Sequence, residues 1–245
     1  MPAEEITSAS AAGPVHINGI CIQREIPSGR FDDGAAAIAA GVGAIREQRG
    51  FPIVNHPNFR WGLTTGEIAS LSGTYGLEIA SGHPDVRERG DPFHPSHEQI
   101  YDELLTRGRD AIAVGVDDMH RLTPEKDAPS EALPGRAWVM TFGGEATRAA
   151  ICDALLAGRM YVSTGVTLRR IVLGASALTV YVDDASATVD FIGAGGRVLD
   201  RGPVVRGPEG LAASYAVRGG ESYVRARVRI DGVGAAWTQA YRVRQ

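Results

Sequence analysis

Five residues of the sequence are of the types that bind metal ions, and each lies in or beside a strand-like segment. His56 and the pair Asp118 and His120 each follow a short apolar run, while His16 lies in a β-leaning segment and Glu5 shortly before it. Carboxylate oxygen and imidazole nitrogen are donors that zinc, manganese and iron accept in proteins. Together, these residues predict a divalent metal site.

Each of these residues also has a plain structural interpretation. His56, between an apolar run and a proline, is equally typical of a structural histidine, and His16 of a histidine in the core. Asp118 and His120 project to the same side of an extended segment, which suits a strand-end cap as well as a ligand pair. The three other histidines (His83, His94 and His97) lie in a polar, proline-containing stretch, which only weakly indicates ligand contact.

Strand-like and helix-like segments alternate before residue 168. We expect strands at 15–22, 51–57, 76–80, 111–116 and 137–142, and helices at 32–50, 97–107 and 145–159. This alternation indicates βα units in a mostly parallel sheet or barrel, in which sites lie at the carboxyl ends of strands. We therefore expect His56 to meet Asp118 and His120. The polar, proline-rich stretch 121–136 is typical of a lid or a substrate wall.

The sequence from 168 to 245 has the period of antiparallel strands, in 178–184 and 222–231 for example. In the second of these segments Val224, Ala226, Val228 and Ile230 share one face, and Tyr223, Arg225, Arg227 and Arg229 share the other. We predict a small antiparallel β-sandwich domain at 168–245, after a β/α barrel portion at 1–167. The arginine row, with Arg242 and Arg244 nearby, is either a solvated outer face or a binding module for an anionic ligand.

Composition excludes few classes of protein. The chain has 245 residues and a net charge of −4, so nucleic-acid and anionic-membrane partners are not favoured. No apolar run approaches the ~20 residues of a membrane span, which fits a soluble protein. The N-terminal residues lack the features of a signal peptide, and localisation stays open. Cys21 and Cys152 lie in apolar stretches and are predicted to be small core residues, with a disulfide between them as the alternative.

The ordered motifs resemble the PHP (polymerase and histidinol phosphatase) family of metal-dependent hydrolases over essentially the whole chain. They are EEITS, PVHING, FPIVNHPNF, GLEIASG, YDELLTRG, AIAVGVDDMH, RAWVMTF and ICDALLAGRMYVSTG, and the segment SYVRARVRIDGVGAAWTQAYRV resembles the β-domain of some bacterial members. The resemblance implies a distorted seven-stranded β/α barrel with up to three zinc, iron or manganese ions. By this resemblance Glu5 would bridge two metals, and His16 and His56 would complete the protein ligands of the second metal. Asp118 would be a ligand of the first metal and His120 a ligand of the third.

The sequence departs from the family at its start. The family opens with His-x-His on its first strand, followed by an Asp/His motif, and neither is found here. The expected fold is therefore an N-terminally incomplete barrel of the (β/α)7 type. A misassigned or fragmentary start, a natural truncation with a reduced site, and a partner chain that supplies the rest all remain open explanations. Exposed barrel edges would need a cover, such as a second copy in a homo-oligomer.

The sequence as a whole predicts a metal-dependent hydrolase that attacks a small phosphoester or related ester with a metal-activated water. Asp118 and His120 are candidate catalytic residues for proton transfer. Arg60 is a candidate for binding a substrate phosphate or carboxylate, although a surface role is equally typical of an arginine there. The alternatives are a catalytically impaired metal-binding or scaffold protein and an anionic-ligand module in the β-domain.

Overall fold

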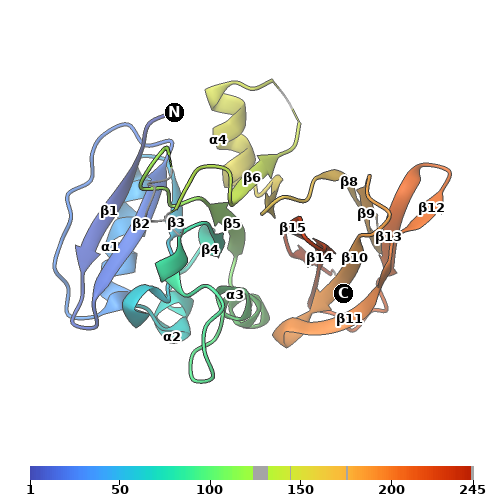
Figure 1. Cartoon of the computed structure of the whole chain (residues 1–245). Helices are drawn as coiled ribbons and strands as arrows, with labels where there is room; N and C mark the ends of the chain where they lie inside the picture. The colour runs from blue at the N-terminus through green and yellow to red at the C-terminus, as the bar shows by residue number, and fades with distance from the viewer. Residues whose placement is uncertain (124–131, 144, 175, 244–245) are drawn as a thin grey trace.

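The computed structural model describes residues 1–123, 132–143, 145–174 and 176–243, which form two lobes built on three sheets (Figure 1). The first lobe holds a five-stranded sheet. Its order is β1 (Ala3–Ala9), β2 (Pro14–Ile20), β3 (Phe51–Val54), β4 (Tyr75–Ser81) and β5 (Ala111–Val116). β1, β2 and β3 are antiparallel to their neighbours, whereas β3, β4 and β5 run parallel. These strands confirm the predictions at 15–22, 51–57, 76–80 and 111–116.

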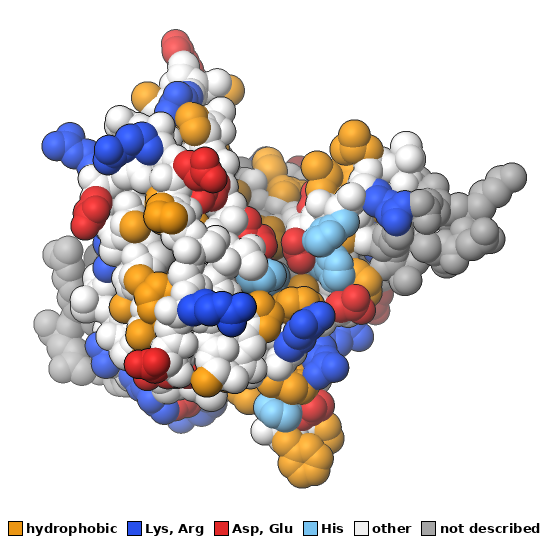
Figure 2. All heavy atoms as spheres, turned by 90° about the vertical axis from the view of Figure 1, so that its left-hand side faces the viewer, with side chains coloured by type: hydrophobic (Ala, Val, Ile, Leu, Met, Phe, Trp, Pro, Cys, Tyr) orange, Lys and Arg blue, Asp and Glu red, His pale blue; other side chains and the backbone are white. Residues whose placement is uncertain are grey.

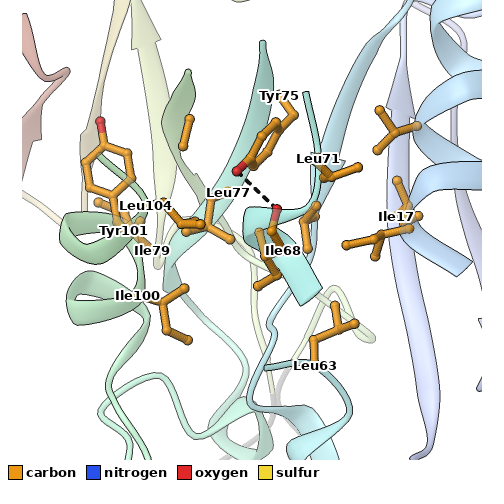
Figure 3. Packing of buried hydrophobic residues seen from close by; sticks show 14 of the residues in the cluster. Ile17, Leu63, Ile68, Leu71, Tyr75, Leu77, Ile79, Ile100, Tyr101 and Leu104 are labelled. Atoms are coloured by element: carbon orange, nitrogen blue, oxygen red, sulfur yellow. Dashed lines mark hydrogen bonds between the residues drawn. The ribbon is translucent and has the colours of Figure 1, made fainter. Parts of the chain in front are cut away.

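Helices cover both faces of this sheet. They are α1 (Gly34–Glu47), α2 (Thr65–Ala69), α3 (His97–Thr106) and α4 (Arg148–Leu156), with short 3₁₀ turns η1 (Phe59–Trp61) and η2 (Pro84–Val86). α1 to α3 pack on one face, where Tyr75 donates a hydrogen bond to the Ile68 carbonyl (Figure 3). α4 packs on the other face through Leu155, against Phe51 and Ile53. Side-chain caps from Asp33 and Ser96 fix where α1 and α3 begin.

The second lobe contains two layered antiparallel sheets. One has the order β11 (Arg197–Pro203), β10 (Thr188–Gly193), β14 (Tyr223–Ile230), β15 (Gly234–Thr238), β7 (Met160–Ser163) and β6 (Trp138–Thr141), and β16 (Tyr241–Arg242) also pairs with β14. The other has the order β12 (Val205–Gly207), β13 (Gly210–Ala216), β9 (Ala177–Val182) and β8 (Leu168–Leu173). The turn η3 (Ala194–Gly196) joins β10 to β11. The two sheets enclose an apolar core that includes Val180, Phe191 and Val228.

The expected PHP-type β/α barrel is wrong. Strands take up 39% and helices 20% of the described residues, and the sheets are antiparallel or mixed. A β/α barrel needs successive parallel strands joined by helices. Here the short 10–13 turn makes β1 and β2 an antiparallel hairpin, and β2 is also antiparallel to β3. After β5 the chain leaves this sheet, because β6 pairs with β7 and β7 with β15 in the second lobe.

The arginine row of β14 faces α3 and Asp190, and of Arg225, Arg227 and Arg229 only Arg229 is exposed. Arg225 is fully buried, and its guanidinium donates hydrogen bonds to both carboxylate oxygens of Asp102 on α3, at 2.8 and 2.6 Å. Arg227 reaches Glu98 on α3 and Asp190 on β10, at 2.8 Å each. Arg229 also lies 3.2 Å from Asp190, so all three guanidinium groups have an ion-pair partner within the chain. Arg244 lies outside the described residues.

Cys21 and Cys152 form a disulfide, which corrects the prediction that they are two separate core residues. The bond joins the end of β2 to α4 across 131 positions of sequence. It fastens α4 over the apolar face of β3 and β5. None of the described helices combines the length and the apolar character needed to cross a membrane.

Candidate metal centre

Glu5, His16 and His56, which we call the first ligand group, come together from three neighbouring strands. Glu5 and His16 lie on the same face of the β1–β2 hairpin, and His56 follows the last residue of β3 by two positions. The His16 Nδ1 atom lies 3.1 Å from a Glu5 oxygen, and the His16 and His56 ring centres are 5.0 Å apart. One donor atom from each residue lies within 4.8 Å of the other two.

The surroundings leave this group with one carboxylate and a neutral imidazole. The hydrogen bond with His16 lowers the pKa of Glu5 below its ordinary range, despite partial burial. Burial lowers the pKa of His56, and the neighbouring His16 lowers it further. A neutral imidazole keeps a nitrogen lone pair, which metal binding requires. Two atoms that each lie about 2.1 Å from one tetrahedral ion are roughly 3.4 Å apart, close to the Glu5–His16 spacing. The donor set therefore fits a divalent ion.

Buried polar side chains hold the first ligand group in place. The Asn55 amide donates to Glu5 at 3.0 Å, and the His56 backbone N–H donates to Glu78 at 3.0 Å. Glu78 is fully buried in β4, and burial raises its pKa to about 8. One oxygen of Asn55 and one of Glu78 have no hydrogen-bond partner among the described residues. Such orphaned polar atoms are rare in protein interiors and mark the surroundings of His56 as unusual.

A second ligand group consists of His83, Asp118 and His120, and parallel strand pairing explains it. Ser81 and Val116, the last residues of β4 and β5, are paired neighbours. His83 and Asp118 each come two residues later, so both emerge at the same edge of the sheet. His120 Nε2 lies 3.5 Å from Asp118, and the His83 and His120 ring centres are 4.9 Å apart. Donor atoms of all three lie within 4.8 Å of one another.

Backbone contacts aim the side chains of this second group. His83 Nδ1 accepts the Asp85 N–H at 3.1 Å, which leaves Nε2 as the ring nitrogen without that contact. The Asp117 carboxylate accepts three backbone N–H groups from residues 135–137. Asp118 has a left-handed backbone, with φ +46°. Non-glycine residues adopt that conformation when their surroundings enforce it, often at functional sites.

The two ligand groups lie near each other on one face of the molecule. The charge of Asp118 raises the pKa of His56 and of Glu78, so it acts on the first group as well. Figure 2 shows histidine side chains and carboxylates gathered in a hollow near the centre of this face. The structure thus links His56 to Asp118 through the charge of Asp118, and it places His120 in the other ligand group.

The structure also places the remaining candidate residues. Arg60 is exposed, and its guanidinium lies 5.4 Å from the ring centre of Phe59, which in turn contacts both His16 and His56. His94 stacks on Trp61 and His97 is fully buried, so neither joins a ligand group in the described chain.

Two residues of this site were not among the predicted ligands: His83, which its sequence context indicated only weakly, and Glu78. A signal for His83 existed, because His-Pro directly follows a strand at 83–84 as it does at 56–57. Glu78 carried no such signal, since a single acid in a strand is equally typical of an exposed face.

Comparisons with family models, with curated proteins and with solved structures found no match for this chain. The resemblance to the PHP family therefore stays a prediction that rests on the motifs.

Proposed function

We propose that this protein is a metal-dependent hydrolase of small phosphoesters or related esters, related to the PHP family in its ligand motifs. The observation that carries the proposal is the convergence of Glu5, His16 and His56 within 4.8 Å of one another. Three protein ligands with an open position are typical of catalytic rather than structural metal sites. Zinc, manganese and iron all accept this donor set.

Each residue has a definite task in this proposal. Glu5, His16 and His56 would hold the ion, and Asn55 and Glu78 would orient two of them. A divalent ion supplies Lewis acidity, which polarises the scissile group and lowers the pKa of a water molecule. Arg60 would contact a charged group of the substrate from beside Phe59.

The second ligand group has two possible tasks, and the number of bound ions distinguishes them. With His83 as third donor, Asp118 and His120 would hold a second ion, and paired ions are a common device of hydrolytic sites. Without that ion, Asp118 would orient His120, whose side chain is 67% exposed, for proton transfer.

Metal content and hydrolysis test the proposal together. We expect the purified chain to bind zinc, manganese or iron and to hydrolyse bis(4-nitrophenyl) phosphate or 4-nitrophenyl acetate in a manner that EDTA abolishes. His56→Ala should lose both properties, while His94→Ala, which removes a histidine outside both groups, should keep them. Unchanged metal content in His56→Ala would overturn the assignment. Bound metal without turnover would favour a metal-binding or scaffold protein instead.

A further inference from the structure

A cleft of about 980 Å³ lies between the two lobes. One wall is the carboxyl end of β4, including Ser81 and Gly82, together with Gly135 and Arg136. The opposite wall is the β14–β15 hairpin, including Arg229 and Trp237. The volume matches that of small-molecule sites, which favour such domain boundaries.

The cleft and the second ligand group are built from the same chain segments. Ser81 and Gly82 line the cleft, and His83 is the next residue. The Asp117 carboxylate accepts the backbone N–H groups of Gly135 and Arg136, which also line the cleft. Asp118 is the residue after Asp117. A Cβ at Gly82 would come within 2.7 Å of the Asp117 carbonyl oxygen, so the two segments touch. The cleft is therefore lined by the residues that directly precede His83, and by residues that Asp117, the neighbour of Asp118, holds in place.

Three arginine side chains, those of Arg89, Arg136 and Arg229, line this cleft. Among the described residues, no hydrogen bond or ion pair engages the side chains of Arg89 and Arg136. Arg229 shares Asp190 with Arg201 and Arg227, and its 3.2 Å contact is the longest of the three.

The acids of the cleft offset these cations only in part. Glu98 is held by Arg225 and Arg227, and Glu88 accepts the Ser81 N–H at 2.8 Å. The side chain of Asp231, between β14 and β15, forms no hydrogen bond or ion pair with the described residues. The apolar side chains of Ile79, Ile230 and Val233 lie among the charged ones.

We propose that this cleft binds a small organic anion with an apolar body, its carboxylate meeting Arg136 and Arg89. Of the stretch 121–136, Gly135 and Arg136 then form part of a substrate wall, and residues 124–131 lie outside the described residues. The idea that this anion is part of the substrate rests on the hydrolase function proposed above. The proposal that the cleft binds the anion does not depend on that function.

Calorimetry with a matched pair of probes tests the proposal. We expect 4-phenylbutyrate to bind more tightly than its neutral amide, with a preference that falls as salt is added. Arg89→Gln and Arg136→Gln should each weaken 4-phenylbutyrate binding about threefold to fivefold, as expected for a partly exposed ion pair. The double variant should lose the preference for the acid, and Arg206→Gln, an exposed arginine on β12, should bind as the wild type does.

His56→Ala and His83→Ala separate this proposal from the metal centre. If the carboxylate lies in the cleft, both variants keep 4-phenylbutyrate binding even when they lose metal or turnover. Loss of binding in these variants, with full binding in Arg89→Gln/Arg136→Gln, would show that the probe sits on the metal and would overturn the proposal. Equal binding of acid and amide by the wild type would overturn it too.

Discussion

The side-chain amide of Gln239 pairs with the backbone of Ala113 in the way that a neighbouring strand would. Its oxygen accepts the Ala113 N–H at 2.8 Å, and its nitrogen donates to the Ala113 carbonyl at 2.9 Å. Ala113 lies in the middle of β5, the last strand of the first sheet. An edge strand exposes unpaired backbone groups that invite association. Here a side chain of the second lobe pairs with that edge strand.

Gln239→Ala should destabilise the protein, because it leaves buried backbone groups of Ala113 without partners. We expect a loss of about 1–3 kcal/mol in the free energy of unfolding, the usual cost of an unsatisfied buried group. Urea denaturation followed by circular dichroism measures it. Gln23→Ala, at an exposed position, is the control and should change stability by less than about 0.5 kcal/mol. Equal effects of the two substitutions would contradict this role of Gln239.

The ion pair between Arg225 and Asp102 should be costly to break from one side. Arg225→Leu leaves the Asp102 carboxylate, which is 4% exposed, without its bidentate partner. Removing one member of such a buried pair costs about 3–5 kcal/mol. Differential scanning calorimetry should show a large drop in the melting temperature. Arg206→Leu should leave that temperature nearly unchanged, and a similar drop there would point to a general effect of lost charge.

Sequence patterns predicted four of the five strands of the first sheet, because strand periodicity depends on local order. The apolar run 111–116 predicts β5, and its parallel pairing with β4 places Asp118 beside His83. The barrel was wrong because pairing is not local. Nothing in residues 137–163 shows that β6 pairs with β7. Nor does it show that β7 pairs with β15, which lies more than 70 positions further along the chain.

Two further differences have the same origin. Alternation along β14 correctly separates its two faces, yet it does not reveal that α3 lies against Arg225 with two carboxylates. In the same way, the apolar surroundings of Cys21 and Cys152 are real. What the sequence does not show is that α4 brings the two residues together across the sheet.

His97 should make the protein sensitive to mild acid. Burial lowers the pKa of His97 from 6.5 to about 3. Between pH 6.5 and pH 3, His97 binds a proton in the unfolded chain but not in the folded chain. The stability that neutral His97 allows is therefore fully present above pH 6.5 and is lost as the pH drops toward 3. The expected slope is about 1 kcal/mol per pH unit.

Stability measured against pH checks this assignment of His97. His97→Gln keeps an acceptor for the Asn58 N–H but does not titrate, so its stability should fall less between pH 7 and 4. His94→Gln, at a half-buried position, should follow the wild type. Parallel curves for wild type and His97→Gln would assign the acid sensitivity to other groups.

Reduction of the Cys21–Cys152 disulfide should loosen α4. A bond that closes a loop of this length restricts the unfolded chain, and the entropy model gives about 4–5 kcal/mol for it. We expect dithiothreitol to lower the melting temperature of the wild type. The Cys21→Ser/Cys152→Ser variant should melt at that lower temperature with or without the reductant. A wild-type melting temperature that dithiothreitol does not change would show that the bond contributes little.

His83→Ala should remove one ion and leave another. His83 is the only histidine of the second ligand group that sequence analysis did not select, and it shares no donor with Glu5, His16 or His56. Losing one of three ligands should weaken the second site on the order of 100-fold or more, since even changes outside the ligands cost 10–100-fold. Mass spectrometry of metal content should show one ion fewer per chain than in the wild type, while His94→Ala keeps the wild-type number. If His83→Ala binds as many ions as the wild type, Asp118 and His120 serve proton transfer. If it loses every ion, the two groups act as one site.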